Sequence, residues 1–243
     1  MQSVFTQDFT VSQIHADRFD RARPAALLYF IQEAAGGHCR LLGADRETLS
    51  EKGLFWAVTR TKVEVARLPR QGEVITVETW PMPTTRVAYP RAAVARDEQG
   101  NELFRSVSLW VLMDEHTRAM VLPGASGVEV CGTLFGSELS IPRAIPQTPL
   151  ANTETRKVGY SLLDCNGHMN NTRYLDWVDD LQSSEFHGKN PIKAFTVCYL
   201  NEAREGDAVV LDFSLSEDGL LAVNACRQAQ DAATRIFSVQ AQY

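Results

Sequence analysis

The order of secondary-structure signals along this chain occurs twice, and that repeat is the strongest constraint on its fold. Residues 4–15 can form a strand. Pro24 then stands where a first helical turn accepts proline, because the N–H that proline lacks has no partner there. The apolar residues after it follow the i, i+3, i+4, i+7 spacing of a helix with one buried face: Leu27, Phe30, Ile31 and Ala34.

Four strand-like segments follow this helix, separated by turn signals that contain glycine or proline. They span residues 55–68, 73–82, 86–97 and 102–114. The same order then begins again, with a strand-like segment at 153–162, a helical segment at 170–182 and four strand-like segments at 194–204, 207–215, 220–227 and 234–242. The two helical segments align with apolar residues at the same positions. This agreement favours a duplicated unit over two unrelated α+β domains.

One strand, one long helix and four further strands describe an α+β unit in which a sheet packs on a helix. We therefore predict a tandem (double) hot-dog, each half a long helix wrapped by a curved antiparallel sheet. Residues 1–122 are the predicted N-terminal hot-dog and residues 153–243 the C-terminal one. Residues 123–152 have the glycine and proline content of a linker. Two hot-dogs in one chain can pair internally, and a homodimer is left open.

Composition excludes several classes of partner. The net charge of -6 argues against non-specific nucleic-acid binding, which needs a basic surface. A local patch of Arg18, Arg21 and Arg23 could still dock an acidic partner, or it could be an ordinary solvated surface. No apolar run approaches the roughly 18 residues of a membrane span, and the N-terminal residues lack the apolar core of a signal peptide.

The cysteines are scattered and include no Cys-x-x-Cys pair: Cys39, Cys131, Cys165, Cys198 and Cys226. This spacing indicates neither a disulfide framework nor a zinc site, so it favours a reducing compartment. We predict a cytoplasmic protein that needs no metal and no cofactor and has no membrane or nucleic-acid partner.

The residues before the second helical segment carry the strongest signal for chemistry. Asp164, Asn166 and His168 are two residues apart, so an extended segment would place all three on one side. The N-terminus of the following helix directs free N–H groups and a positive dipole end toward them. Such a cluster can hold a carbonyl group whose oxygen becomes negative during attack.

A polar loop at a helix entrance is the structural alternative for these residues. The corresponding residues 17–23 of the first half contain neither the asparagine nor the histidine. Because that helix begins without them, the second half has polar residues that need another explanation, and we interpret them as a candidate active site.

The motif and the segment about thirty residues later resemble the acyl-acyl-carrier-protein thioesterase family, and the likeness covers nearly the whole chain. The residues that carry it are Asp164-x-Asn166-x-His168-x-Asn170-Asn171-x-x-Tyr174 and Tyr199-x-x-Glu202. The resemblance implies a double hot-dog fold and a fatty acyl chain on the phosphopantetheine of acyl carrier protein as substrate. It also implies that Asp164, Asn166, His168 and Glu202 are catalytic.

One departure from the family bears on mechanism. Plant members commonly have a cysteine directly after the glutamate, where this chain has Ala203. A cysteine–histidine acyl-enzyme route is therefore disfavoured. Cys165 is a formal alternative nucleophile, although in an extended segment it would point away from Asp164 and Asn166.

The residue types suggest a hydrolytic mechanism. We predict that Glu202 and His168 polarise the attacking water, with either one as the base. Asn166 would position water or substrate, Asp164 would orient the cluster, and backbone N–H groups of residues 167–170 could hold the oxyanion. Without the family likeness, Glu202 would be interpreted as a surface glutamate on a strand.

The first half has Leu68 near the position of Glu202 and lacks the histidine, so we interpret it as the acyl-binding half. The candidate pocket residues are Phe55, Trp56, Leu27 and Phe30. Three other functions compete: an acyl-CoA thioesterase, a hot-dog dehydratase and a non-catalytic acyl-binding protein. The dehydratases differ in motif, and the intact Asp/Asn/His/Glu set argues against loss of catalysis.

Overall fold

The computed structural model describes residues 3–130, 132–228 and 233–243. The chain divides into two compact units, Met1–Pro142 and Arg143–Tyr243. None of the helices in these described ranges has the length and the apolar content to cross a membrane.

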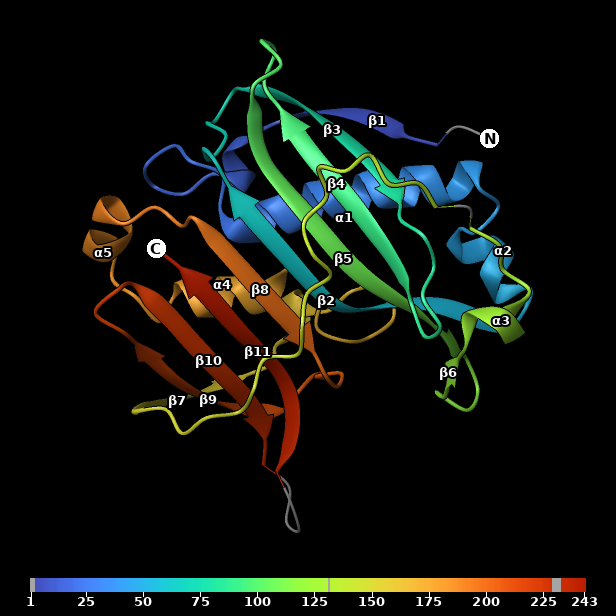
Figure 1. Ribbon diagram of the computed structural model, residues 1–243. Coiled ribbons are helices and arrows are strands. Elements are labelled where there is room, and N and C mark those ends of the chain that lie inside the picture. Colours follow the sequence, from blue (N-terminus) through green and yellow to red (C-terminus); the bar gives the residue numbers. More distant parts are fainter. Residues whose placement is uncertain (1–2, 131, 229–232) are drawn as a thin grey trace. The chain divides into compact units, whose positions relative to one another are not determined.

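The first unit packs a long helix against an antiparallel sheet (Figure 1). Its sheet order is β1-β3-β4-β5-β2, and the short β6 pairs with β5. The strands are β1 (Phe5–Thr10), β2 (Leu54–Val65), β3 (Val74–Pro81), β4 (Tyr89–Arg96), β5 (Glu102–Asp114) and β6 (Met120–Val121). The helices are η1 (Gln13–His15), α1 (Pro24–Leu41), α2 (Arg46–Ser50) and α3 (Pro123–Ser126).

Helix α1 forms as its apolar spacing predicts. Pro24 is its first residue, and Leu27, Phe30 and Ile31 lie in the core. Burying each such side chain stabilises the fold by roughly 1.5–3 kcal/mol. Gly43 follows the helix with φ of 64°, a conformation that glycine adopts without steric strain, and so lets the chain turn away.

The second unit repeats the topology of the first. Its elements are β7 (Asn152–Lys157), η2 (Tyr160–Leu162), α4 (Arg173–Asp179), α5 (Ser184–Lys189), β8 (Ala194–Tyr199), β9 (Ala208–Leu215), β10 (Leu220–Arg227) and β11 (Thr234–Gln242). Their antiparallel order is β7-β9-β10-β11-β8. Counted from the first strand of each half, both sheets have the order 1-3-4-5-2, so the repeat that the sequence predicts extends to strand pairing.

The second half departs from prediction at its helix. The long helix expected over residues 170–182 is wrong, because α4 ends at Asp179 and a separate helix α5 begins at Ser184. Ser183 caps this second helix by accepting a hydrogen bond from the Phe186 N–H at 3.2 Å. Because such a cap satisfies an N–H group at the start of a helix, Ser183 begins α5 as a separate helix.

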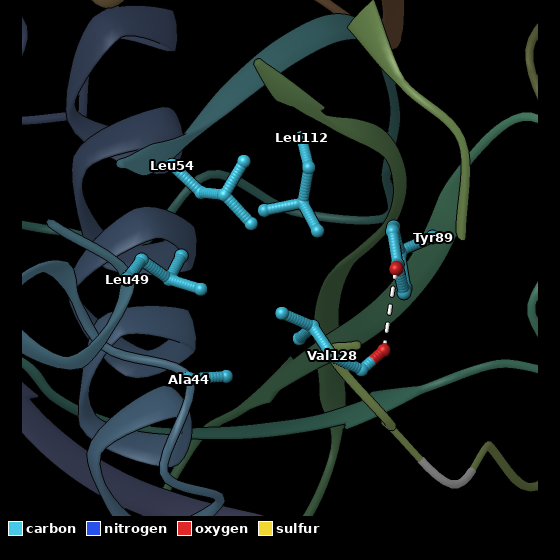
Figure 2. Close-up of a cluster of buried hydrophobic side chains, with 6 residues drawn as sticks. All are labelled: Ala44, Leu49, Leu54, Tyr89, Leu112 and Val128. Carbon is cyan, nitrogen blue, oxygen red and sulfur yellow. Dashed lines mark hydrogen bonds between the residues drawn. The ribbon is translucent and has the colours of Figure 1, made fainter. Parts of the chain in front are cut away.

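A hydrophobic cluster at one end of the first sheet includes a residue of the predicted linker (Figure 2). Its members are Ala44, Leu49, Leu54, Tyr89, Leu112 and Val128. The Tyr89 hydroxyl donates a hydrogen bond to the Val128 carbonyl at 3.3 Å. Further along, the Thr133 N–H donates to the Pro81 carbonyl at 2.9 Å. Residues 123–130 and 132–142 therefore belong to the first unit.

Truncating this cluster should lower stability measurably. Leu112 is fully buried, so Leu112→Ala is expected to reduce the free energy of unfolding by about 2–5 kcal/mol. Leu41 is 60% exposed, and Leu41→Ala should change it by less than about 0.5 kcal/mol. Equilibrium urea denaturation of both variants measures the difference, and equal midpoints would contradict this account of the core.

Candidate active site

The residues of the predicted motif form a tight turn between η2 and α4. The Asp164 carboxylate accepts a hydrogen bond from the Asn166 N–H at 2.8 Å, and the Asp164 N–H donates to the His168 carbonyl at 2.8 Å. Gly167 has φ of 76°, in the left-handed region. The predicted extended segment is therefore wrong, because an aspartate that bonds to the backbone two residues ahead closes a turn.

This turn brings His168 into contact with Glu202. His168 Nε2 lies 2.9 Å from Glu202 Oε2, with side-chain exposures of 17% and 37%. The contact depends on the backbone, because the Met169 N–H donates to the Ala203 carbonyl at 2.8 Å. His168 itself pairs with Arg204 as an isolated β-bridge. The two predicted site residues are thus adjacent although they lie far apart in sequence.

Glu202 lies in a loop and not on the predicted strand. Strand β8 ends at Tyr199, and the Leu200 and Asn201 N–H groups both donate to the Ile236 carbonyl. Two donors on one acceptor break the regular ladder, and the chain leaves the sheet before Glu202.

Arg204 is a residue of this site that sequence reasoning missed. Its Nη2 lies 3.4 Å from the same Glu202 Oε2 that faces His168. The guanidinium side chain is 65% exposed, so this ion pair adds at most about 1 kcal/mol to stability. The available signal was its position two residues after Glu202, on the same side of an extended stretch.

Backbone donors near the turn are already in use. The Gly167, Met169 and Asn170 N–H groups donate to the carbonyls of Asp164, Ala203 and Leu162 at 3.1, 2.8 and 2.9 Å. The prediction that residues 167–170 hold an oxyanion is wrong for these three groups. The His168 N–H points to Asp164 Oδ1 at 3.5 Å.

Two tyrosines, the buried Tyr174 and the partly buried Tyr199, anchor the turn to the sheet. The Tyr199 hydroxyl donates to the Asn171 carbonyl at 3.1 Å, and its ring meets that of Tyr174 edge-on with centroids 5.8 Å apart. Burial raises the pKa of Tyr174 to about 12, and burial likewise raises the pKa of Tyr199. Both phenols therefore stay protonated at neutral pH and serve as supports rather than bases.

The first half contains the same turn without the polar site. The Phe19 N–H donates to Asp17 Oδ1 at 2.8 Å, and the Asp17 N–H donates to the Arg21 carbonyl at 2.7 Å. Asp17 thus corresponds to Asp164 and Arg21 to His168. Asp20 stands in the place of Gly167 and also has a positive φ of 59°.

The partner loop is repeated as well. The Ala22 N–H donates to the Pro69 carbonyl at 2.7 Å, as Met169 does to Ala203. Leu68 therefore occupies the position of Glu202, in agreement with the sequence analysis. The aspartate and the backbone bonds belong to both halves, whereas the asparagine, histidine and glutamate belong to the second alone.

The predicted acyl-binding residues of the first half separate into two groups. Trp56 lines a cavity of about 270 Å³ in the first unit. Leu27 and Phe30 are fully buried on α1, and Phe55, next to Trp56 on β2, lies under the Arg118 guanidinium at 4.5 Å. Among the described residues, these three are not part of the cavity wall.

Metal binding has no visible basis in the described parts of the chain. No three histidine, cysteine, aspartate or glutamate side chains gather there as ligands.

Comparison with known proteins identifies the family. Residues 2–122 match the acyl-ACP thioesterase N-terminal domain, and residues 148–236 match the acyl-ACP thioesterase C-terminal domain. The chain belongs to the acyl-ACP thioesterase family. This family membership agrees with the resemblance found in the sequence.

Individual members of the acyl-ACP thioesterase family are distant in sequence. A chloroplastic palmitoyl-acyl carrier protein thioesterase of Gossypium hirsutum is 27% identical over 214 residues, which cover 82% of this chain and 52% of that protein. The chain thus spans about half the length of the plant relatives it matches.

Solved structures of the family share the fold. A crystal structure of an acyl-ACP thioesterase from Bacteroides thetaiotaomicron has a TM-score of 0.89 at 24% identity, over 99% of this chain and 97% of that one. The 12:0-ACP thioesterase from Umbellularia californica has a TM-score of 0.83 at 22% identity, over 100% and 97%. These matches confirm the predicted α+β fold of hot-dog type.

The left-handed residue of the turn can be tested by substitution. Gly167→Ala adds a side chain at φ of 76° and should lower the free energy of unfolding by about 1–2 kcal/mol. Gly159→Ala is the matched control, because Gly159 lies just upstream at φ of -100° with open space around its missing Cβ. Urea denaturation compares the two, and equal losses would show that the turn conformation is not a constraint.

Proposed function

We propose that this protein hydrolyses fatty acyl-ACP thioesters to free fatty acid and holo-ACP. The observation that carries the proposal is the contact of 2.9 Å between His168 Nε2 and Glu202 Oε2. This pair lies in the half that carries the additional polar residues, and the same position in the other half is filled by Arg21 and Leu68. Membership of the acyl-ACP thioesterase family supports the choice of substrate.

The chemistry requires a base, an oxyanion donor and a leaving thiolate. Water attacks the thioester carbonyl while the His168–Glu202 pair accepts its proton. The tetrahedral intermediate then expels the phosphopantetheine thiolate, which takes up a proton to give the thiol of holo-ACP. A carboxylate in contact with imidazole stabilises the imidazolium that forms if His168 is the base, so the pair acts as one unit.

The exposed Asn166 is the group best suited to hold the oxyanion. The neighbouring N–H groups of Gly167, Met169 and Asn170 are bound to carbonyls, and that of His168 faces Asp164 Oδ1 at 3.5 Å. The side-chain amide of Asn166 is a further local donor. A side-chain oxyanion donor contributes about 2.7–4 kcal/mol to transition-state stabilisation in other hydrolases.

Asp164 acts as a positioning residue in this scheme. Its Oδ1 accepts the Asn166 N–H, and Asp17 accepts the Phe19 N–H in the same way where no site exists. The first half has Arg21 and Leu68 in place of His168 and Glu202. Because Asp17 makes the same hydrogen bond there, we assign Asp164 to formation of the turn and not to proton transfer.

Cysteine chemistry has little support in this arrangement. Ala203 is fully buried and Cys198 lies buried on β8, while Cys165 is exposed in the turn. Water activated by His168 and Glu202 accounts for hydrolysis without an acyl-cysteine.

Removal of either member of the pair should slow hydrolysis strongly. Glu202→Gln and His168→Ala are each expected to lower kcat by about 10²–10⁴-fold, the usual contribution of a general base. Thiol release from acyl-ACP measures the rate, and Cys165→Ala is the control that should keep it. Near-normal turnover of Glu202→Gln would reject the assigned pair.

Two substitutions of Asp164 distinguish the effect of its charge from the effect of its hydrogen bonds to the backbone. Asparagine can accept the same backbone hydrogen bonds, so Asp164→Asn should retain kcat within about tenfold. Asp164→Ala should lose activity and also about 0.5–2 kcal/mol of stability, the range found for a lost side-chain cap. Kinetics and urea denaturation of both variants measure the outcome. Asp17→Asn is the control for the kinetics alone, because it also removes the ion pair between Asp17 and Arg21. A 100-fold loss in Asp164→Asn would instead make the carboxylate a catalytic group.

The carrier can be tested directly. Matched acyl-ACP and acyl-CoA thioesters of several chain lengths are offered to the purified protein, and thiol release is followed. We expect preference for acyl-ACP; strong preference for CoA esters would favour an acyl-CoA thioesterase. Absence of release from both would favour a dehydratase or an acyl-binding protein. The cytoplasmic location and a homodimer stay predictions.

A further inference from the structure

The cavity of the first unit has an apolar wall and a buried cation. Trp56, Tyr89, Trp110 and Val130 supply much of the apolar wall. Arg91 of β4 also lines the cavity and is only 7% exposed. A ligand that fits this space must therefore offer both an apolar surface and a group that suits a guanidinium.

Arg91 has no carboxylate partner among the described residues. Its contacts are His38 Nδ1 at 3.1 Å, Thr79 Oγ1 at 3.4 Å and Cys39 Sγ at 3.8 Å. Burial lowers the pKa of Arg91, yet arginine stays charged at neutral pH. The cation is thus buried without a fixed negative charge, which is an unfavourable state for the empty cavity.

Neither acidic group near Arg91 supplies the missing charge. Burial raises the pKa of the Cys39 thiol, so this side chain is neutral at pH 7. Asp45 also lines the cavity, but its carboxylate caps α2 by accepting from the N–H groups of Glu47 and Thr48 at 3.0 and 3.2 Å. Cys39 is thus a neutral contact of Arg91 at 3.8 Å, and the Asp45 carboxylate, although charged, makes no ion pair with Arg91 among the described residues.

A second donor on the same wall lacks an acceptor. The buried Nε1 of Trp110 has no hydrogen-bond partner in the described structure. Tyr89 pairs with Trp110 and Arg91 pairs with Ser108 across β4 and β5. Directly paired residues lie on the same face of a sheet, and so do residues two apart on one strand. Arg91 and Trp110 are therefore diagonal neighbours on the face that lines the cavity.

We propose that this cavity binds an aliphatic carboxylate, with the carboxylate against Arg91 and Trp110. The hydrocarbon chain lies against the aromatic side chains of Trp56 and Tyr89. Arg40 and Arg46 also line the cavity and are exposed. With Arg91 they outnumber the single carboxylate of the wall, Asp45, so the local charge favours entry of an anion. The source of the carboxylate rests on the proposed function: it is either the released fatty acid or an acyl chain that carries a carboxylate at its far end.

Direct binding tests the site independently of hydrolysis. Octanoate and octanol are titrated into the whole protein, with calorimetry and tryptophan fluorescence as readouts, since Trp56 and Trp110 line the cavity. We expect octanoate to bind more tightly than octanol. Arg91→Met should weaken octanoate at least tenfold, or about 1.4 kcal/mol, without weakening octanol. Arg96→Met is the matched control on β4, because Arg96 pairs with Glu78 at 3.3 Å and does not line the cavity.

Other variants keep the test valid if Arg91→Met fails to fold. Arg91→Lys keeps a charge and should bind octanoate more tightly than it binds octanol. Trp110→Phe keeps the ring, loses the N–H and should weaken octanoate roughly fivefold, the value of one hydrogen bond. Equal affinity for octanoate and octanol, absence of octanoate binding, or octanoate affinity unchanged by all three substitutions would overturn the proposal.

Two kinetic arms distinguish the sources. If the ligand is the product, octanoate inhibits hydrolysis of methyl-ended acyl-ACP, and Arg91→Met relieves the inhibition. If the ligand is a carboxylate at the far end of the substrate's acyl chain, an acyl-ACP with a terminal carboxylate has a higher kcat/KM than the methyl-ended acyl-ACP. Arg91→Met then removes that preference. Octanoate binding that depends on Arg91 without any thiol release would reject the proposed hydrolysis but support the carboxylate site.

Discussion

The hydrogen bond from the Met169 N–H to the Ala203 carbonyl joins the two loops on which the site depends. One loop enters α4 and the other follows β8, and the bond makes His168 and Glu202 neighbours. Because it joins backbone atoms, the side chains beside it can change without loss of the connection. The same bond exists between Ala22 and Pro69, where the neighbouring side chains are Arg21 and Leu68.

Both halves contain the same pair of loops joined by a backbone hydrogen bond, which explains how one half can carry chemistry that the other lacks. In both halves an aspartate closes the turn and a residue with positive φ follows, Asp20 in one case and Gly167 in the other. In the first half, Arg21 Nε and Nη2 then bind Asp17 Oδ2 at 3.1 and 3.0 Å. That pairing uses the carboxylate fully in local structure. In the second half a histidine at the same position faces Glu202. The candidate site thus differs from the structural turn in three side chains: Asn166, His168 and Glu202 replace Phe19, Arg21 and Leu68.

The sequence predicted the elements more reliably than the local geometry of the site. Helix α1, the repeat and the equivalence of Leu68 with Glu202 follow from apolar periodicity and alignment, which depend on burial. The extended form expected for Asp164 to His168 did not occur, because a side-chain bond to the backbone outweighed alternation. The end of β8 depends on Ile236, a residue distant in sequence, and no local pattern marks it. Arg91 did have a signal: it is the one charged residue within the apolar run Tyr89–Ala95.

That arginine is difficult to explain by stability alone. Replacing buried ionic groups by apolar side chains of similar volume is often neutral or stabilises a protein by about 1–4 kcal/mol. A methionine in place of Arg91 would remove the buried charge, and the contacts of Arg91 with His38, Cys39 and Thr79 include no carboxylate. Arg91 lies on the wall of the cavity and is not a member of the hydrophobic cluster around Leu112. The free-energy cost of burying the Arg91 charge can therefore be offset by an anion bound in the cavity. This is expected of a residue that binds a ligand and not of one required only for folding.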